Sequence, residues 1–164
     1  YLGLPQEIAE KLEGVVGTND YRLFLDRGAK AFGEDLVAEL KDTIPFGVQH
    51  PLLRTHPETG KTALFFNSAF LRHDSLADAA TGAPLGDEVS RALVAKLLQQ
   101  HHRPEYLCRF PWTEGALAFW DNRAVQHYAA SDYYPHRRVL RRVTISGSRP
   151  YYAPEEAPAV PPLF

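Results

Sequence analysis

Methionine is absent from the sequence, and it contains a single cysteine. Translation begins with methionine, so a chain that starts at Tyr1 is expected to be processed, a fragment, or the ordered part of something longer. One cysteine, Cys108, excludes an internal disulfide and a thiolate metal cluster. We expect Cys108 to be a small buried hydrophobe, and a lone cysteine fits the reducing cytoplasm in which we place the protein.

Long apolar runs and a strong excess of one charge are also missing. No run approaches the roughly 18 residues that a membrane span needs, and no signal peptide is visible. The formal net charge is −2, which gives no basic surface for nucleic acid. The sequence has 164 residues, of which 45% are hydrophobic and 23% charged, as in an ordinary soluble globular domain.

Hydrophobic spacing predicts several elements before the final third of the chain. Apolar residues at helical spacing predict a helix over 5–16, a short one over 34–40, and a clear one over 87–102, with a stripe from Val89 to Leu98. A turn rich in proline and glycine separates two apolar stretches, 50–55 and 62–66, which predicts a β-hairpin. A further strand is expected over 104–112.

The stretch 116–145 carries the strongest pattern. It predicts strands over 116–120, around His127, and over 139–145, with a turn at 121–123. Alternation in the last strand would place Arg138 and Arg142 on one face. Because a buried charge is costly without a partner, two arginines on one face indicate sites for two anions.

Four segments carry a resemblance to a known family. They are WDNRAVQHYA with HRRVLRRVTI in the central stretch, RTHPETGKTALFFNSAF (54–70), PEYLCRFPW (104–112) and ISGSRPYY (145–152). Together they resemble the C-terminal part of the taurine dioxygenase family. Those enzymes are Fe(II)- and 2-oxoglutarate-dependent oxygenases built on a double-stranded β-helix, or jelly roll.

The resemblance implies a mainly β fold with flanking helices, incomplete in this chain. Residues 1–152 would be the C-terminal part of one jelly-roll domain, and 153–164 a proline-rich extended tail. Residues 18–44 match a variable insertion near the mouth of the family's site, or merely cover the barrel.

The same resemblance implies the site residues. His127 matches a catalytic iron ligand, and the other two ligands, a His-x-Asp pair, are expected upstream of Tyr1. Arg138 matches the arginine that holds 2-oxoglutarate, unless it only forms a surface salt bridge. Arg142 and Phe70 match substrate-binding positions, although Arg142 could instead support the 2-oxoglutarate pocket and Phe70 could belong to the core.

Other histidines receive structural interpretations. His56-Pro57-Glu58 formally fits a His-x-Glu metal motif, but its proline and the following Gly60 indicate a tight turn, so we reject it as a metal site. His101 and His102 end the predicted helix over 87–102 and are expected to be cationic caps there.

The implied activity is hydroxylation of a small anionic substrate by O2, with 2-oxoglutarate converted to succinate and CO2. Taurine or another sulfonate is expected first, which would place the enzyme in taurine catabolism and sulfur metabolism; an alkyl sulfate or aryloxy acid is the alternative. By resemblance the enzyme would be a homo-oligomer, a dimer or tetramer. Two readings remain open beside it: a truncated, inactive domain that binds anions or partners, and a cupin-like ligand module.

Overall fold

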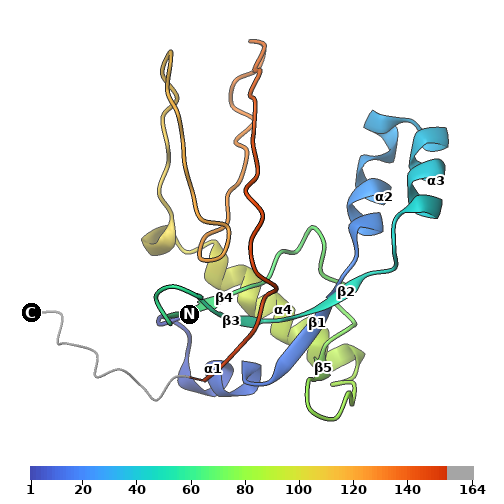
Figure 1. Ribbon diagram of the computed structural model, residues 1–164, viewed down its shortest axis with the longest axis vertical. Coiled ribbons are helices and arrows are strands. Elements are labelled where there is room, and N and C mark those ends of the chain that lie inside the picture. Colours follow the sequence, from blue (N-terminus) through green and yellow to red (C-terminus); the bar gives the residue numbers. More distant parts are fainter. Residues whose placement is uncertain (155–164) are drawn as a thin grey trace, which may run out of the picture.

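The computed structural model describes residues 1–154 as a small body with three projections (Figure 1). One projection is a helical hairpin, formed by α2 (Tyr21–Phe32) and α3 (Glu34–Thr43). The other two are long extended loops that rise side by side, which we call the first arm (107–120) and the second arm (127–150). None of the helices in the described part is long and apolar enough to cross a membrane.

The body contains two small antiparallel sheets. In the first, β1 (Val15–Asn19) lies between β2 (Val48–Pro51) and β5 (Ala77–Asp78). The second is a hairpin of β3 (Leu53–Thr55) and β4 (Thr62–Leu64), as predicted. The predicted strand over 50–55 is divided, because its first half pairs with β1 and its second half pairs with β4.

Two of the three predicted helices are observed close to their predicted bounds. α4 (Asp87–His101) and α3 confirm the predicted helices. α1 (Gln6–Leu12) is shorter than predicted, because Gly14 adopts a φ of 69° and the chain then enters β1. A positive φ suits glycine, which has no Cβ to clash.

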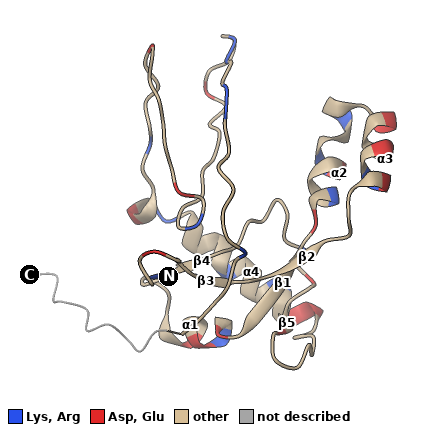
Figure 2. Cartoon of the chain, in the orientation of Figure 1, with Lys and Arg blue, Asp and Glu red and all other residues tan. Residues whose placement is uncertain are grey.

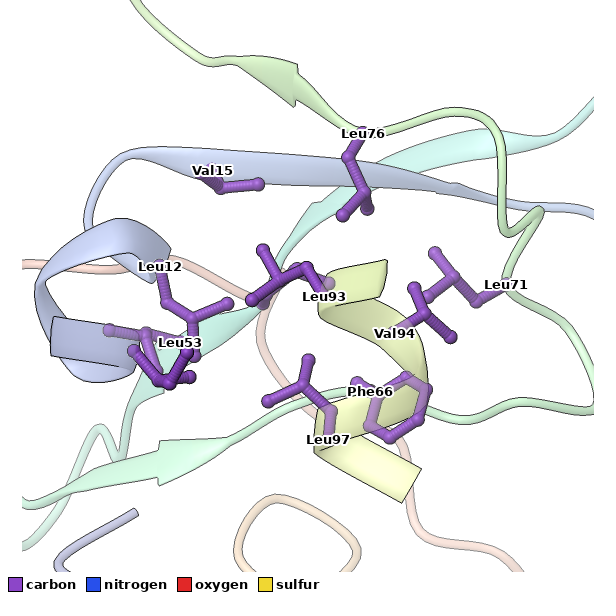
Figure 3. Packing of buried hydrophobic residues seen from close by; sticks show 11 residues of the cluster. Leu12, Val15, Leu53, Phe66, Leu71, Leu76, Leu93, Val94 and Leu97 are labelled. Carbon is purple, nitrogen blue, oxygen red and sulfur yellow. The ribbon is translucent and has the colours of Figure 1, made fainter. Parts of the chain in front are cut away.

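The core lies where α4 packs on the strands and on α1. Figure 3 shows Leu93 and Leu97 of α4 on the side of Leu12 and Leu53, and Val94 beside Leu71; all six are almost fully buried. The predicted stripe is wrong at its first member: Val89 is 54% exposed. Burying apolar surface of this kind is worth about 25 cal/mol per Å², so these contacts hold the body together.

The predicted strands of the final third are not formed in the described residues. Pro104–Tyr106 is a short 3-10 turn, and no strand is assigned within 107–154. Extended backbone becomes a strand only when a neighbouring chain takes up its hydrogen bonds. Cys108, expected to be buried, is exposed on the first arm. The expected tail lies outside the described residues from 155 onward.

The chain that leaves the second arm is nevertheless attached to the body. The Thr55 backbone N–H donates to the carbonyl of Tyr151 at 2.9 Å, and the Thr55 hydroxyl oxygen accepts from the N–H of Ala153 at 3.0 Å. Figure 2 shows mostly basic residues near the tip of the second arm, with one acidic residue, Asp132, among them. The arm residues that carry this charge are Arg137, Arg138, Arg141 and Arg142.

Candidate active site

His127 lies at the foot of the second arm, just after a turn that begins at Asp121. The carbonyl of Asp121 accepts from the N–H groups of Ala124 and Val125 at 3.1 and 3.0 Å, which closes this turn. The His127 ring rests against Trp120, with ring centroids 4.8 Å apart. The imidazole is otherwise exposed, so its nitrogens are accessible to a ligand.

A metal site requires more donors than His127 provides. Among residues 1–154, no group of three or more His, Cys, Asp or Glu side chains is placed to hold a metal ion. An iron site of the two-histidine, one-carboxylate type needs three protein donors. The residues present therefore fit iron only as one donor of a set that other residues would have to complete.

Arg138 follows the turn at the tip of the second arm and is half-buried. Its Nη1 donates to the carbonyl of Ala130 at 3.2 Å, and its guanidinium lies 5.6 Å from the centre of the Tyr133 ring. A guanidinium carries several N–H donors in a planar fork, and this hydrogen bond uses one of them. The rest are available to an anion.

Arg142 is exposed and forms no ion pair or hydrogen bond with any residue in 1–154. No strand is assigned here, so the predicted sharing of one strand face by Arg138 and Arg142 is not seen. What the structure retains is their proximity along one arm. Both cations remain free for anionic partners.

Phe70 faces the helical hairpin. Its ring lies 5.8 Å from those of both Tyr21 and Phe24, which are on α2. The backbone agrees, because the carbonyl of Phe70 accepts from the N–H of Asp20 at 2.7 Å. The segment 18–44 is therefore attached to the body at Phe70.

A buried histidine is the centre of a network that the sequence did not predict. His56, which is 8% exposed, places Nε2 3.0 Å from Oδ2 of Asp121. Arg123 donates to the same carboxylate from Nε at 2.9 Å and from Nη2 at 2.7 Å, and from Nη1 to Glu58 at 2.7 Å. These hydrogen bonds join the turn after β3 to the turn before His127.

The hydrogen bonds of this network shift the pKa values of Asp121 and Arg123. Hydrogen bonds from Arg123, and then from His56, hold the pKa of the Asp121 carboxyl well below its usual range. Asp121, and then Glu58, raise the pKa of the Arg123 guanidinium. The ion pair is thus fully charged at any pH near neutrality.

The two turns that form this network can each be recognised in the sequence, but they lie far apart along the chain. The segment His56-Pro57-Glu58 reads as a turn, and Asp121 and Arg123 belong to another turn 65 residues along the chain from the first. Neither turn indicates its partner, since sequence spacing carries no information about contacts between distant loops. The structure gives His56 and Glu58 roles other than metal binding.

His101 differs from its predicted role. The ring stacks on Phe66, with centroids 4.7 Å apart, and burial lowers the pKa of the imidazole. A neutral ring packed on an aromatic side chain is not a cationic cap. The C-cap position belongs to His102, whose N–H donates to the carbonyl of Leu98 at 3.2 Å.

Comparison with known proteins identifies the class. The chain matches the family described as "Taurine catabolism dioxygenase TauD, TfdA family" over residues 1–144. The chain therefore belongs to this family, as its signature segments indicated.

Individual relatives differ in substrate. The chain is 38% identical over 102 residues to an alkylsulfatase of Acinetobacter baylyi, covering 62% of this chain and 29% of that protein. It is 31% identical over 149 residues to an alpha-ketoglutarate-dependent 2,4-dichlorophenoxyacetate dioxygenase of Burkholderia sp., covering 91% of this chain and 46% of that protein. The chain thus spans less than half the length of these relatives.

A solved structure is similar in fold. It is a Burkholderia xenovorans protein assigned as an alpha-ketoglutarate dependent 2,4-D dioxygenase, with a TM-score of 0.59 and 27% identity. The match covers 76% of this chain and 43% of that one. The similarity supports an arrangement of the body like that of this family.

Proposed function

We propose that the protein is an Fe(II)- and 2-oxoglutarate-dependent dioxygenase that hydroxylates a small anionic organic substrate. Membership of the TauD/TfdA family over residues 1–144 is the observation that carries this proposal. In this reaction, the substrate, O2 and 2-oxoglutarate yield the hydroxylated product, succinate and CO2. The fold proposed for the complete domain is the jelly roll, in which the arms would pair with further strands.

Each candidate side chain has a chemistry that suits its proposed role. His127 is exposed, so it can donate a neutral ring nitrogen to iron, with the other two ligands drawn from residues upstream of Tyr1. Arg138 retains free donors for the distal carboxylate of 2-oxoglutarate, which a guanidinium binds through two parallel hydrogen bonds. When bound, iron and 2-oxoglutarate supply the oxidising chemistry, and the protein positions the substrate.

The substrate is proposed to be a sulfonate such as taurine or a sulfate ester, with an aryloxy acid as the alternative. Arg142 would meet the anionic group, and Phe70, with its aromatic neighbours on α2, would contact the organic part. Relatives named for sulfate esters and for a sulfonate support the first choice. The relative named for 2,4-dichlorophenoxyacetate supports the alternative.

The test is a direct assay of the full-length protein. With Fe(II), ascorbate and 2-oxoglutarate, succinate should form at a rate that depends on one member of a panel containing taurine, other sulfonates, alkyl sulfates and aryloxy acids. His127→Ala should abolish this turnover. No substrate-dependent succinate with any member of the panel, from protein that binds iron, would reject the proposal.

A second candidate is a domain that binds anions or a protein partner without turnover. The lack of a three-donor metal group among residues 1–154 favours it. Iron binding by the full-length protein separates the two candidates. A bound iron that requires His127 supports the enzyme, and an absence of iron binding supports the second candidate.

A further inference from the structure

We propose that His56, Glu58, Asp121 and Arg123 form a latch that positions His127 by pinning the turn before it to the β3–β4 hairpin. These four are positioning residues, because none of them reaches His127 directly. Hydrogen bonds among these side chains attach the turn to the hairpin. The consequence of the latch for metal binding rests on the proposed function.

The first half of the latch is a histidine in one fixed tautomer. Nδ1 of His56 accepts from the backbone N–H groups of Glu58 and Thr59, at 3.3 and 3.2 Å. A nitrogen that accepts these bonds carries no proton, so the proton of the neutral ring is on Nε2. Nε2 therefore donates to Oδ2 of Asp121, which lies 3.0 Å away.

The second half is a carboxylate whose two oxygens are both occupied. Oδ1 of Asp121 accepts from the backbone N–H of Arg123 at 2.8 Å and from its Nε at 2.9 Å. Oδ2 accepts from Nη2 of Arg123 at 2.7 Å as well as from His56. Arg123 then uses Nη1 on Glu58, so the two turns are joined by two side-chain links, His56–Asp121 and Arg123–Glu58.

A second anchor lies on the other side of the turn. The side-chain amide of Gln126 donates to the carbonyl of Phe66, two residues beyond the end of β4. His56 directly follows β3, so both anchors belong to the ends of one hairpin. His127 is the residue after Gln126, and its backbone position is therefore set by this hairpin at both sides of the turn.

Three of the four latch residues are partly shielded from water, which makes their hydrogen bonds worth more than those of a surface ion pair, whereas Glu58 is 71% exposed. Side-chain exposure is 10% for His56, 35% for Asp121 and 28% for Arg123. By contrast, the Arg91–Asp87 pair on α4 has exposures of 59% and 65%. That pair has similar geometry, with Nε 2.8 Å from Oδ1, and serves as a matched control.

The experiment compares Asp121→Asn, His56→Phe, their double variant and Arg123→Lys with the control Asp87→Asn. Asp121→Asn keeps the side-chain shape and removes the negative charge. His56→Phe keeps a ring and removes the Nε2 donor. Arg123→Lys keeps the positive charge and removes the planar fork. The first readout needs no metal. Wild-type His56 should show the ¹⁵N shifts of an Nε2-protonated tautomer, and amides 122–127 should exchange at least about 10-fold faster in the latch variants. The control should leave these amides unchanged.

The second readout is Fe(II) affinity of the full-length protein under anaerobic conditions. Changing a residue that orients a metal-binding histidine typically weakens binding by about 10–100-fold, and we expect the lower end for the latch variants. The double variant should be less than additive, since both changes break one link. Arg123→Lys should fall between wild type and Asp121→Asn.

The outcomes separate this inference from the proposed function. Unchanged exchange at 122–127, additive effects or an Nδ1-protonated His56 would overturn the latch, whatever the metal does. Faster exchange with unchanged Fe(II) affinity would overturn the positioning of His127 but leave its role as a ligand.

If wild type binds no Fe(II), the proposed function fails, and local exchange alone decides the latch. If Asp121→Asn does not fold, Glu58→Gln, which alters the exposed end only, gives the same comparison.

Discussion

Arg123 and Arg138 show how the surroundings of an arginine indicate its task. Arg123 uses its guanidinium on Asp121 and Glu58, so two carboxylates already compensate its charge. Arg138 uses one N–H on a backbone carbonyl and lies over a tyrosine ring. A neutral acceptor leaves the charge of Arg138 uncompensated, and an anionic ligand would supply the missing partner.

With the proposed function, Arg138→Ala should therefore raise the KM for 2-oxoglutarate of the full-length protein. A hydrogen-bonded pair between charged groups is worth about 1.5–3 kcal/mol, which corresponds to about 10- to 100-fold. The KM for the substrate should change much less, and Arg142→Ala should show the opposite pattern. Steady-state kinetics with each compound varied in turn measures both, and equal changes in the two KM values would contradict the assignment.

His101 gives a prediction about pH. Burial places its folded-state pKa below the unfolded value of about 6.5, so the unfolded chain binds more protons in the interval between the two. The contribution of His101 to stability is therefore complete above about pH 6.5 and is lost as pH falls toward the folded pKa. Burial lowers the pKa of His50 and His73 too, so they share this slope.

Urea unfolding between about pH 5 and 7 measures this slope. His101→Leu should flatten it while keeping the contact with Phe66. His102→Leu, at an exposed position, should leave it unchanged. An unaltered slope in His101→Leu would show that the ring is not the buried neutral group described above.

At the scale of elements, the sequence predicted helices and turns, which depend mainly on residues close together in the chain. Helical spacing predicted α4 and α3, and the turn around Gly60 predicted the β3–β4 hairpin. The strand β1 was missed, because Val15 continues a helical pattern and only its partners β2 and β5 make it a strand. The latch was missed for a related reason, since its two turns meet only in the folded chain.

The face of α4 gives the element-scale prediction. Leu97 is fully buried, so Leu97→Ala should remove about 2–5 kcal/mol from the free energy of unfolding through lost burial and a cavity. Val89 belongs to the same apolar pattern but is 54% exposed, and Val89→Ala should change stability by less than about 0.5 kcal/mol. Chemical denaturation of both variants measures the difference. Similar losses would place Val89 in the core after all.

At the scale of the whole molecule, the arms carry apolar side chains that the described body does not cover. Leu117 is 91% exposed, Phe119 86% and Val143 92%. Exposed apolar side chains on extended backbone without strand partners favour association with other chains. In a complete jelly roll, further strands would cover these side chains, which is why the arms bear on the proposed fold.

The 164-residue chain, prepared alone, should therefore self-associate and bind the dye ANS. The double variant Leu117→Lys and Val143→Lys should reduce both, because charged side chains on an exposed edge oppose pairing with other chains. Leu2→Lys is the matched control, since Leu2 is 87% exposed but lies outside the arms. Light scattering coupled to gel filtration measures association. A monomeric wild-type chain that binds no dye would mean that the arms are covered by the chain itself, and the proposed pairing with further strands would then have no surface on which to form.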